Sequence, residues 1–161
     1  LSRQAGVQLD RATNGPIVDN FFQTSVNGIF AAGNVVHVYD LVDWVTEAGY
    51  AAGKGAALFA MGILQRPITQ AATIAGENVS YVVPQKIDLQ ALKREKIPLQ
   101  MRVTHPIEKP VWVEAAADGE RIVRRALPYA RPGEMITLNL KPDHIDAIQS
   151  GNQTTITILE R

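Results

Sequence analysis

The 161-residue sequence contains no cysteine, which excludes a disulfide framework, a thiolate metal site and a cysteine nucleophile within the chain. Neither sign of charge is in excess, because 16 Lys and Arg balance 16 Asp and Glu. This balance predicts no nucleic acid and no anionic membrane as a partner. The most apolar stretch, residues 56–64, is too short to span a bilayer. We therefore expect a protein of the cytoplasm.

The first feature that is present is a short, fully apolar run at residues 28–33, GIFAAG. A run of this kind predicts a strand buried on both faces of a parallel sheet. Gly33 can adopt backbone angles that a Cβ would forbid, which suits a sharp exit from the strand. A long helix is predicted from Asp40 to about Leu64, with Asp40 as N-cap and Asp43 in the first turn. Its Ala and Gly face predicts close approach by another backbone.

The second half of the chain changes to an alternating pattern. We expect a linker or crossover over 70–77, and then strands over 79–83, 99–104, 111–115, 120–126, 135–140 and 154–159. Asp118-Gly119 predicts a hairpin turn between two of them. Short strands separated by turns indicate a small antiparallel sandwich or barrel. The expected domains are residues 1–72 and 78–161.

The stretch Thr24–Val35, TSVNGIFAAGNV, resembles the second flavin motif of the pyridine nucleotide-disulfide oxidoreductase superfamily, usually T-x-x-x-G-[IV]-[FY]-A-x-G-D. That group includes thioredoxin reductases and NADH oxidases. The resemblance implies an α+β chain. Residues 1–72 would be the C-terminal strand–helix piece of an FAD-binding Rossmann-like domain, followed by a β-rich accessory domain. The implied function is part of an FAD-dependent, NAD(P)H-linked oxidoreductase.

The resemblance also implies roles for individual residues. Gly33 would let the chain approach the FAD ribitol and diphosphate. Asn34 stands where the family usually has Asp, so it can still accept a hydrogen bond but carries no charge. The amino end of the following helix would face the pyrimidine edge of the flavin, where its N–H groups favour an anion. The implied cofactor-binding residues are Gly33, Asn34, Val35, Asp43, Trp44 and Val45.

Other parts of such an enzyme are not in this sequence. It holds no G-x-G-x-x-G fingerprint and no nicotinamide-binding domain. It begins without Met, which we interpret as a processed chain or a fragment. The expected partner is the N-terminal FAD and NAD(P) portion of the same protein, with a homodimer or a partner subunit also possible. The alternative hypothesis is a non-catalytic partner-docking module with a degenerate flavin motif. Alone, the chain should be inactive and bind FAD weakly or not at all.

Three further groups of residues allow two interpretations each. His37, Asp40, Asp43 and Glu47 form either a metal or acid–base cluster or, as we favour, a loop His beside acidic residues that compensate a helix N-terminus. The segment 49–55 is one residue short of a phosphate loop, so helix packing is the better interpretation. Arg121, Arg124, Arg125 and Arg131 predict a solvated face or a subunit contact rather than a nucleic-acid site. Trp112, on an alternating strand, is expected in the core.

Overall fold

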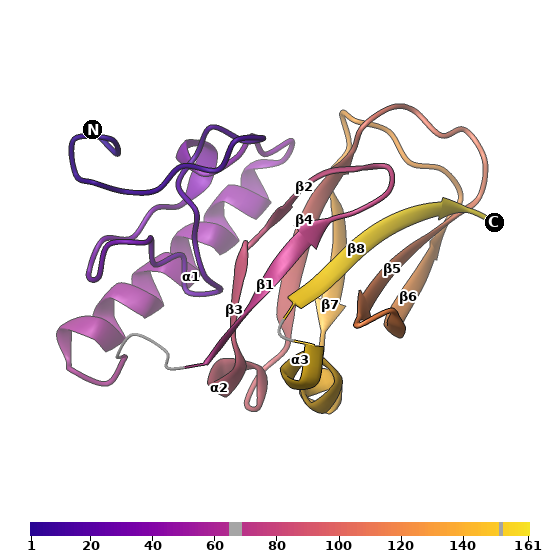
Figure 1. Cartoon of the computed structure of the whole chain (residues 1–161). Coiled ribbons are helices and arrows are strands. Elements are labelled where there is room, and N and C mark those ends of the chain that lie inside the picture. The colour runs from indigo at the N-terminus through magenta and orange to yellow at the C-terminus, as the bar shows by residue number, and fades with distance from the viewer. Residues whose placement is uncertain (65–68, 152) are drawn as a thin grey trace. The chain divides into compact units, whose positions relative to one another are not determined.

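The computed structural model describes residues 1–64, 69–151 and 153–161 and divides the chain into two compact units. The first unit is Leu1–Ile68 and the second is Thr69–Arg161 (Figure 1). Helix dominates the regular structure of the first unit, and two β-sheets dominate the second. The chain is therefore of the α+β class.

The first unit begins as a folded loop rather than as sheet. Isolated bridges join Leu9 to Pro16, Val18 to Thr24 and Gln23 to Phe30. The predicted buried strand over 28–33 is therefore wrong, since residues 28–32 form no ladder and all remain at least partly exposed. A parallel strand needs neighbouring strands to accept its backbone hydrogen bonds, and the described residues of this unit offer only single bridges.

One long helix, α1 (Val42–Ala60), follows a 3₁₀ turn, η1 (Gly33–Val35). The helix is shorter than predicted at both ends, and its N-cap is Leu41, not Asp40. Asp43 lies in the first turn as expected. The predicted close approach is confirmed at Gly55, where an added Cβ would meet the backbone oxygen of Phe21 at 2.8 Å.

Within the part of the chain that the structure describes, the second unit contains all eight strands, two short α-helices and a 3₁₀ helix (Figure 1). In chain order its elements are β1 (Gln70–Ala75), β2 (Val79–Val83), β3 (Lys86–Asp88), α2 (Leu89–Leu92), β4 (Ile97–Val103), β5 (Val111–Ala117), β6 (Glu120–Leu127), β7 (Ile136–Leu140), η2 (Pro142–His144), α3 (Ile145–Gly151) and β8 (Gln153–Glu160). The first sheet has the order β3-β1-β8-β5-β6 and the second has the order β2-β4-β7.

One hydrophobic core lies between the two sheets. Every strand except β6 contributes fully buried apolar side chains, and β6 adds only partly buried ones. On β5 the alternation is regular, since Val111, Val113 and Ala115 are buried and the residues between them are not. The core therefore follows the two-residue period of the sequence.

Several predictions for the second unit are confirmed and two are wrong. β2 has the predicted bounds, and Asp118 and Gly119 form the hairpin turn with positive φ at both positions, which suits a type I′ geometry. The expected linker is instead strand β1, which pairs with β3 and β8. The β1–β8 pair is parallel, so the sheets are not purely antiparallel. Among the described residues, no helix combines the length and the apolar character needed to cross a membrane.

Candidate functional site

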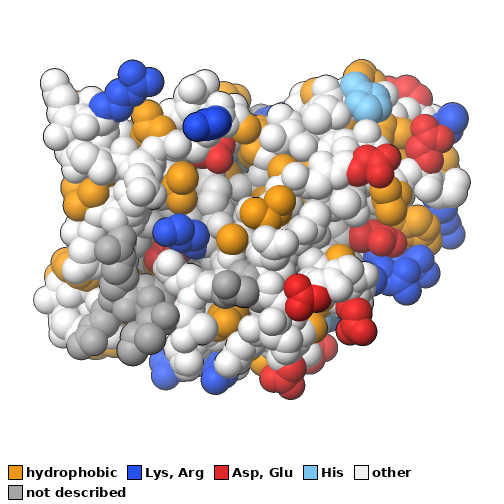
Figure 2. Space-filling model, in the orientation of Figure 1, with side chains coloured by type: hydrophobic (Ala, Val, Ile, Leu, Met, Phe, Trp, Pro, Cys, Tyr) orange, Lys and Arg blue, Asp and Glu red, His pale blue; other side chains and the backbone are white. Residues whose placement is uncertain are grey.

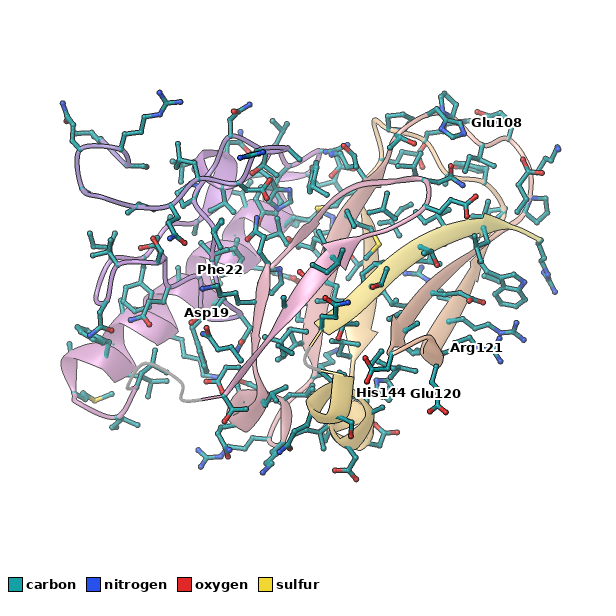
Figure 3. The ribbon with its side chains drawn as sticks, in the orientation of Figure 1. Asp19, Phe22, Glu108, Glu120, Arg121 and His144 are labelled. Carbon is teal, nitrogen blue, oxygen red and sulfur yellow. The ribbon has the colours of Figure 1, made fainter. Side chains whose placement is uncertain are left out.

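A loop anchored by Asp19 holds the segment that carries the flavin-like motif. Asp19 is buried, and its Oδ1 accepts hydrogen bonds from the backbone N–H groups of Phe21 at 2.9 Å and Gln23 at 3.0 Å (Figure 3). Phe22, between them, has a φ of 58°, which is uncommon for a bulky side chain. The backbone oxygen of Phe22 then accepts from the N–H of Ala31 at 3.0 Å. The motif is thus held as a tight loop.

This anchoring role of Asp19 was not predicted. The signal for it in the sequence is an Asp in a loop, because an Asp carboxylate can accept hydrogen bonds from the N–H groups of the next few residues. This is the pattern of an Asx turn. The apolar run after it dominated the interpretation, although the run itself forms no strand. The sequence pattern predicted a strand in this segment, and it did not predict the Asp19 turn that fixes the shape of the loop.

Gly33 sits where the loop meets α1. Its φ is +71°, it is buried, and an added Cβ would lie 3.4 Å from Cγ1 of Val45. Its carbonyl oxygen accepts the N–H of Val36 at 2.9 Å, which closes the η1 turn. The structure therefore brings two of the predicted site residues together, Gly33 and Val45, in a conformation that favours glycine.

Asn34 has a fixed orientation. Its Oδ1 accepts the backbone N–H of Tyr39 at 3.2 Å. Because the donor is an N–H group, the oxygen must be the atom that faces Tyr39. The amide NH₂ group is therefore the part of this exposed side chain that is directed elsewhere. Val35, the next predicted residue, is also exposed.

The amino end of α1 lacks a side-chain cap. Leu41 is extended, with φ −127° and ψ 140°, and its side chain makes no capping hydrogen bond. The first-turn N–H groups of a helix have no intrahelical acceptor, so this end carries partial positive charge. Asp43 is exposed, while Trp44 and Val45 are partly buried. All six predicted residues thus lie in η1 or the first turns of α1.

The structure favours the simpler interpretation of the histidine and acidic cluster and of the glycine-rich segment. His37 is buried, and its ring centroid lies 4.2 Å from that of Tyr39. Over the described ranges, no group of three His, Asp or Glu side chains could hold a metal ion. The segment 49–55 lies within α1, as the helix-packing interpretation requires. His144 accepts the N–H of Lys141 through Nδ1 at 3.1 Å and is partly buried (Figure 3).

The four arginines do not form one patch. Arg121 and Arg124 lie 3.9 and 4.0 Å from the Glu114 carboxylate. Arg125 donates to the backbone oxygen of Thr137 at 2.8 Å. Arg131 makes two hydrogen bonds to Glu108, which lies near one end of the second unit in Figure 3. Acidic side chains are spread across the face of this unit shown in Figure 2, with basic side chains toward its edges.

Trp112 was predicted in the core, and this is wrong. It is partly exposed on the outward side of β5, with the Arg124 guanidinium 4.2 Å and the Arg161 guanidinium 4.7 Å from its ring. The alternation of β5 explains the difference, because Val111 and Val113 take the inward positions.

Comparison with known proteins gives no identity: no family model matches the chain, and neither curated proteins nor solved structures give a significant match.

Proposed function

We propose that this chain supplies the ribitol and ring side of the FAD site in an FAD-dependent, NAD(P)H-linked oxidoreductase. The observation that carries the proposal is Gly33, whose left-handed backbone lies against Val45 in the first turn of an uncapped helix. A glycine beside the amino end of a helix is an arrangement that a phosphorylated or anionic ligand can use, because the backbone can approach closely and the helix end carries partial positive charge. It occurs within the stretch that resembles a flavin motif.

The residues present fit one half of such a cofactor. Gly33 offers close backbone approach, the amide of Asn34 can donate to a hydroxyl oxygen, and the α1 amino end can stabilise negative charge on the ring. Asp43, exposed in the same turn, reduces that positive potential. The chain holds no dinucleotide fingerprint for the diphosphate. The proposal therefore needs the remaining FAD and NAD(P) portion of the same protein as its partner.

Within that assembly, residues 1–72 would be the C-terminal strand–helix piece of a Rossmann-like FAD-binding domain. FAD, when bound, would supply hydride exchange with a nicotinamide. The contribution of this chain is to hold the ribitol, to orient the ring edge and to present the helix dipole to it. We assign this activity to the cytoplasm.

The alternative is a partner-docking module with a degenerate flavin motif. The observation that favours it is the exposure of Val35, Val38, Leu41 and Val42, which is unusual for contiguous apolar residues of a monomer. Both hypotheses need a partner, but only the first needs FAD.

The test is the visible spectrum of the full natural polypeptide that contains this chain, purified without added flavin. We expect bound yellow flavin. Gly33→Ala should weaken flavin binding, because an alanine is strained at the φ of +71° that Gly33 adopts. Gly6→Ala is the matched control, since Gly6 has φ +72° and nothing within 4 Å of an added Cβ. Asn34→Asp should bind FAD several-fold more tightly, because a charged acceptor makes stronger hydrogen bonds. A colourless wild-type protein that does not bind added FAD contradicts the proposal and favours the docking module.

A further inference from the structure

An apolar and acidic surface surrounds the amino end of α1. We call it the α1 surface; its members are Val35, Val38, Asp40, Leu41, Val42, Asp43 and Glu47. Val38 is 65% exposed and Val42 is 76% exposed. The three acidic residues are exposed as well. Contiguous exposed apolar residues with a polar rim mark an interaction site.

The charge of this region is strongly one-sided. Between Arg11 and Lys54 the sequence has no Lys or Arg. Asp43 and Glu47 are four residues apart on α1, so they lie on the same helix face. A partner of the α1 surface therefore needs an apolar centre and a basic rim, and an acidic or nucleic-acid partner does not fit.

The second unit carries a surface of that kind on the outer side of its five-stranded sheet. We call it the β surface; its members are Trp112, Arg121, Arg124, Leu159 and Arg161. Leu159 is paired in register with Trp112, so the two lie side by side on adjacent strands. Arg124 and Arg161 stack over the Trp112 ring, at 4.2 and 4.7 Å. Arg121, labelled in Figure 3, extends the basic rim toward the β5–β6 turn.

The β surface keeps a net positive charge. Its acidic neighbour Glu114 lies 3.9 Å from Arg121 and 4.0 Å from Arg124, which are long distances for ion pairs. The side chains of Arg121 and Arg124 remain 53% and 43% exposed, so both can still face a carboxylate of another molecule. Trp and Arg are also the residue types that contribute most to the centres of protein interfaces.

From this complementarity we propose that the α1 surface of one copy of the chain docks on the β surface of a second copy. The proposed assembly is a two-fold dimer, in which each copy contributes one α1 surface and one β surface. Apolar contact would come from Val38, Leu41 and Val42 against Trp112 and Leu159. The carboxylates of Asp43 and Glu47 would face the arginines. The inference needs no cofactor. It uses the same amino end of α1 that the flavin proposal places at the ring, so the two contacts are alternatives for this surface.

The experiment uses the 161-residue chain in sedimentation equilibrium over a concentration series at low and high salt. The wild type should dimerise, and its Kd should rise with ionic strength. Asp43→Arg and Arg124→Glu should each raise the Kd by at least about tenfold, because like charges then face each other in both contacts. The matched controls are Asp146→Arg in the first turn of α3 and Arg125→Glu on β6, which lie outside the two surfaces.

Mixing the two variants gives the decisive result. In a mixed dimer, one contact pairs the introduced arginine with the introduced glutamate, and the other contact is the wild-type pair. Two variants that are monomeric alone should therefore dimerise when mixed, a result that loss of folding cannot produce. A wild type that is monomeric at every concentration overturns the proposal, and leaves the α1 surface to another partner such as the rest of a flavoprotein. A dimer that neither variant weakens also overturns it.

Discussion

The two units of this chain bury their apolar residues to very different extents. The second unit encloses one continuous core between its sheets, with Leu99, Met101 and Ile158 fully buried. Among the described residues, eight of the nine exposed large hydrophobic side chains belong to the first unit, and only Ile74 belongs to the second. Because burial of apolar surface is the main favourable term in folding, the second unit should be much more stable on its own.

The difference also shows how function can be distributed in a chain. A unit that encloses its own core needs no partner to be stable, and its functional residues are added to its surface. A unit that leaves apolar side chains exposed beside a helix terminus is suited to complete a larger site. The flavin-like segment and the α1 surface both lie in the first unit, which leaves its apolar side chains exposed in this way. The following predictions test this comparison, beginning with the largest expected effect.

Truncation of a core residue should separate the units most clearly. Leu99→Ala should lower the unfolding free energy of the second unit by about 2–5 kcal/mol, because Leu99 is fully buried. Leu41→Ala, on the exposed α1 surface, should change the stability of the first unit by less than about 0.5 kcal/mol. Each unit has one tryptophan, Trp44 or Trp112, so urea unfolding followed by fluorescence in single-tryptophan variants reports them separately. A larger effect at Leu41 than at Leu99 would contradict the comparison.

Two glycines of α1 test how closely the first unit is packed. Gly55→Ala should destabilise this unit by about 1–3 kcal/mol, because the new methyl group would lie 2.8–2.9 Å from atoms of Phe21 and Phe30. Gly53→Ala is the control: nothing lies within 4 Å of its added Cβ, and alanine favours the helix by up to about 1 kcal/mol. Thermal unfolding followed by the fluorescence of Trp44 measures both. Equal effects would mean that this helix face is not in close contact with the loop.

The sequence predicted the elements whose pattern is local. β2 and the Asp118-Gly119 hairpin depend on alternation and on turn residues that are adjacent in the chain, and both were predicted correctly. β1 was predicted as a linker because its six residues, QAATIA, are mostly small or polar. Its conformation depends on pairing with β3 and with β8, about 80 residues away. A single sequence contains no direct record of such pairings.

The candidate site shows the same limit at smaller scale. Helix α1 was predicted from helical spacing, and the unusual backbone conformation of Gly33 was predicted from the properties of glycine. The apolar run before Gly33 was predicted as a strand because its composition fits one, but the neighbours that would make it a strand are not present among the described residues. Trp112 was predicted in the core because it lies on an alternating strand, whereas the register of β5 turns it outward.

Even the well-packed unit has a buried hydroxyl group whose removal should improve its stability. Thr154 is fully buried, and its Oγ1 has no hydrogen-bond partner in the described structure. Thr154→Val keeps the shape of the side chain and removes the unsatisfied hydroxyl, so it should stabilise the second unit by about 1 kcal/mol. Thr155→Val, at the next and partly exposed position, should have little effect. Urea unfolding followed by the fluorescence of Trp112 distinguishes them, and destabilisation by Thr154→Val would show that the hydroxyl is satisfied.

The smallest expected effect is at a surface ion pair of the second unit. Arg131 donates to both carboxylate oxygens of Glu108, at 2.9 and 3.0 Å, and these hydrogen bonds lower the pKa of Glu108 below its ordinary value. The pair therefore adds stability above the ordinary carboxyl pKa of about 4.3, and this contribution is lost as the pH falls through the lower folded-state pKa. Glu108→Gln should slightly reduce the stability of the second unit at neutral pH. The difference in stability between this variant and the wild type should disappear in acid.

An NMR titration of the Glu108 carboxyl group checks the cause directly. Its pKa should return toward the ordinary value in Arg131→Ala, because the first and largest cause of the shift is the hydrogen bonding from that guanidinium. Both side chains are largely exposed, so the effect on unfolding should be well below that of Leu99→Ala. If Glu108→Gln instead destabilised the second unit as much as a core truncation does, its stability could not be attributed to the enclosed apolar core, and the contrast between the two units would lose its physical basis.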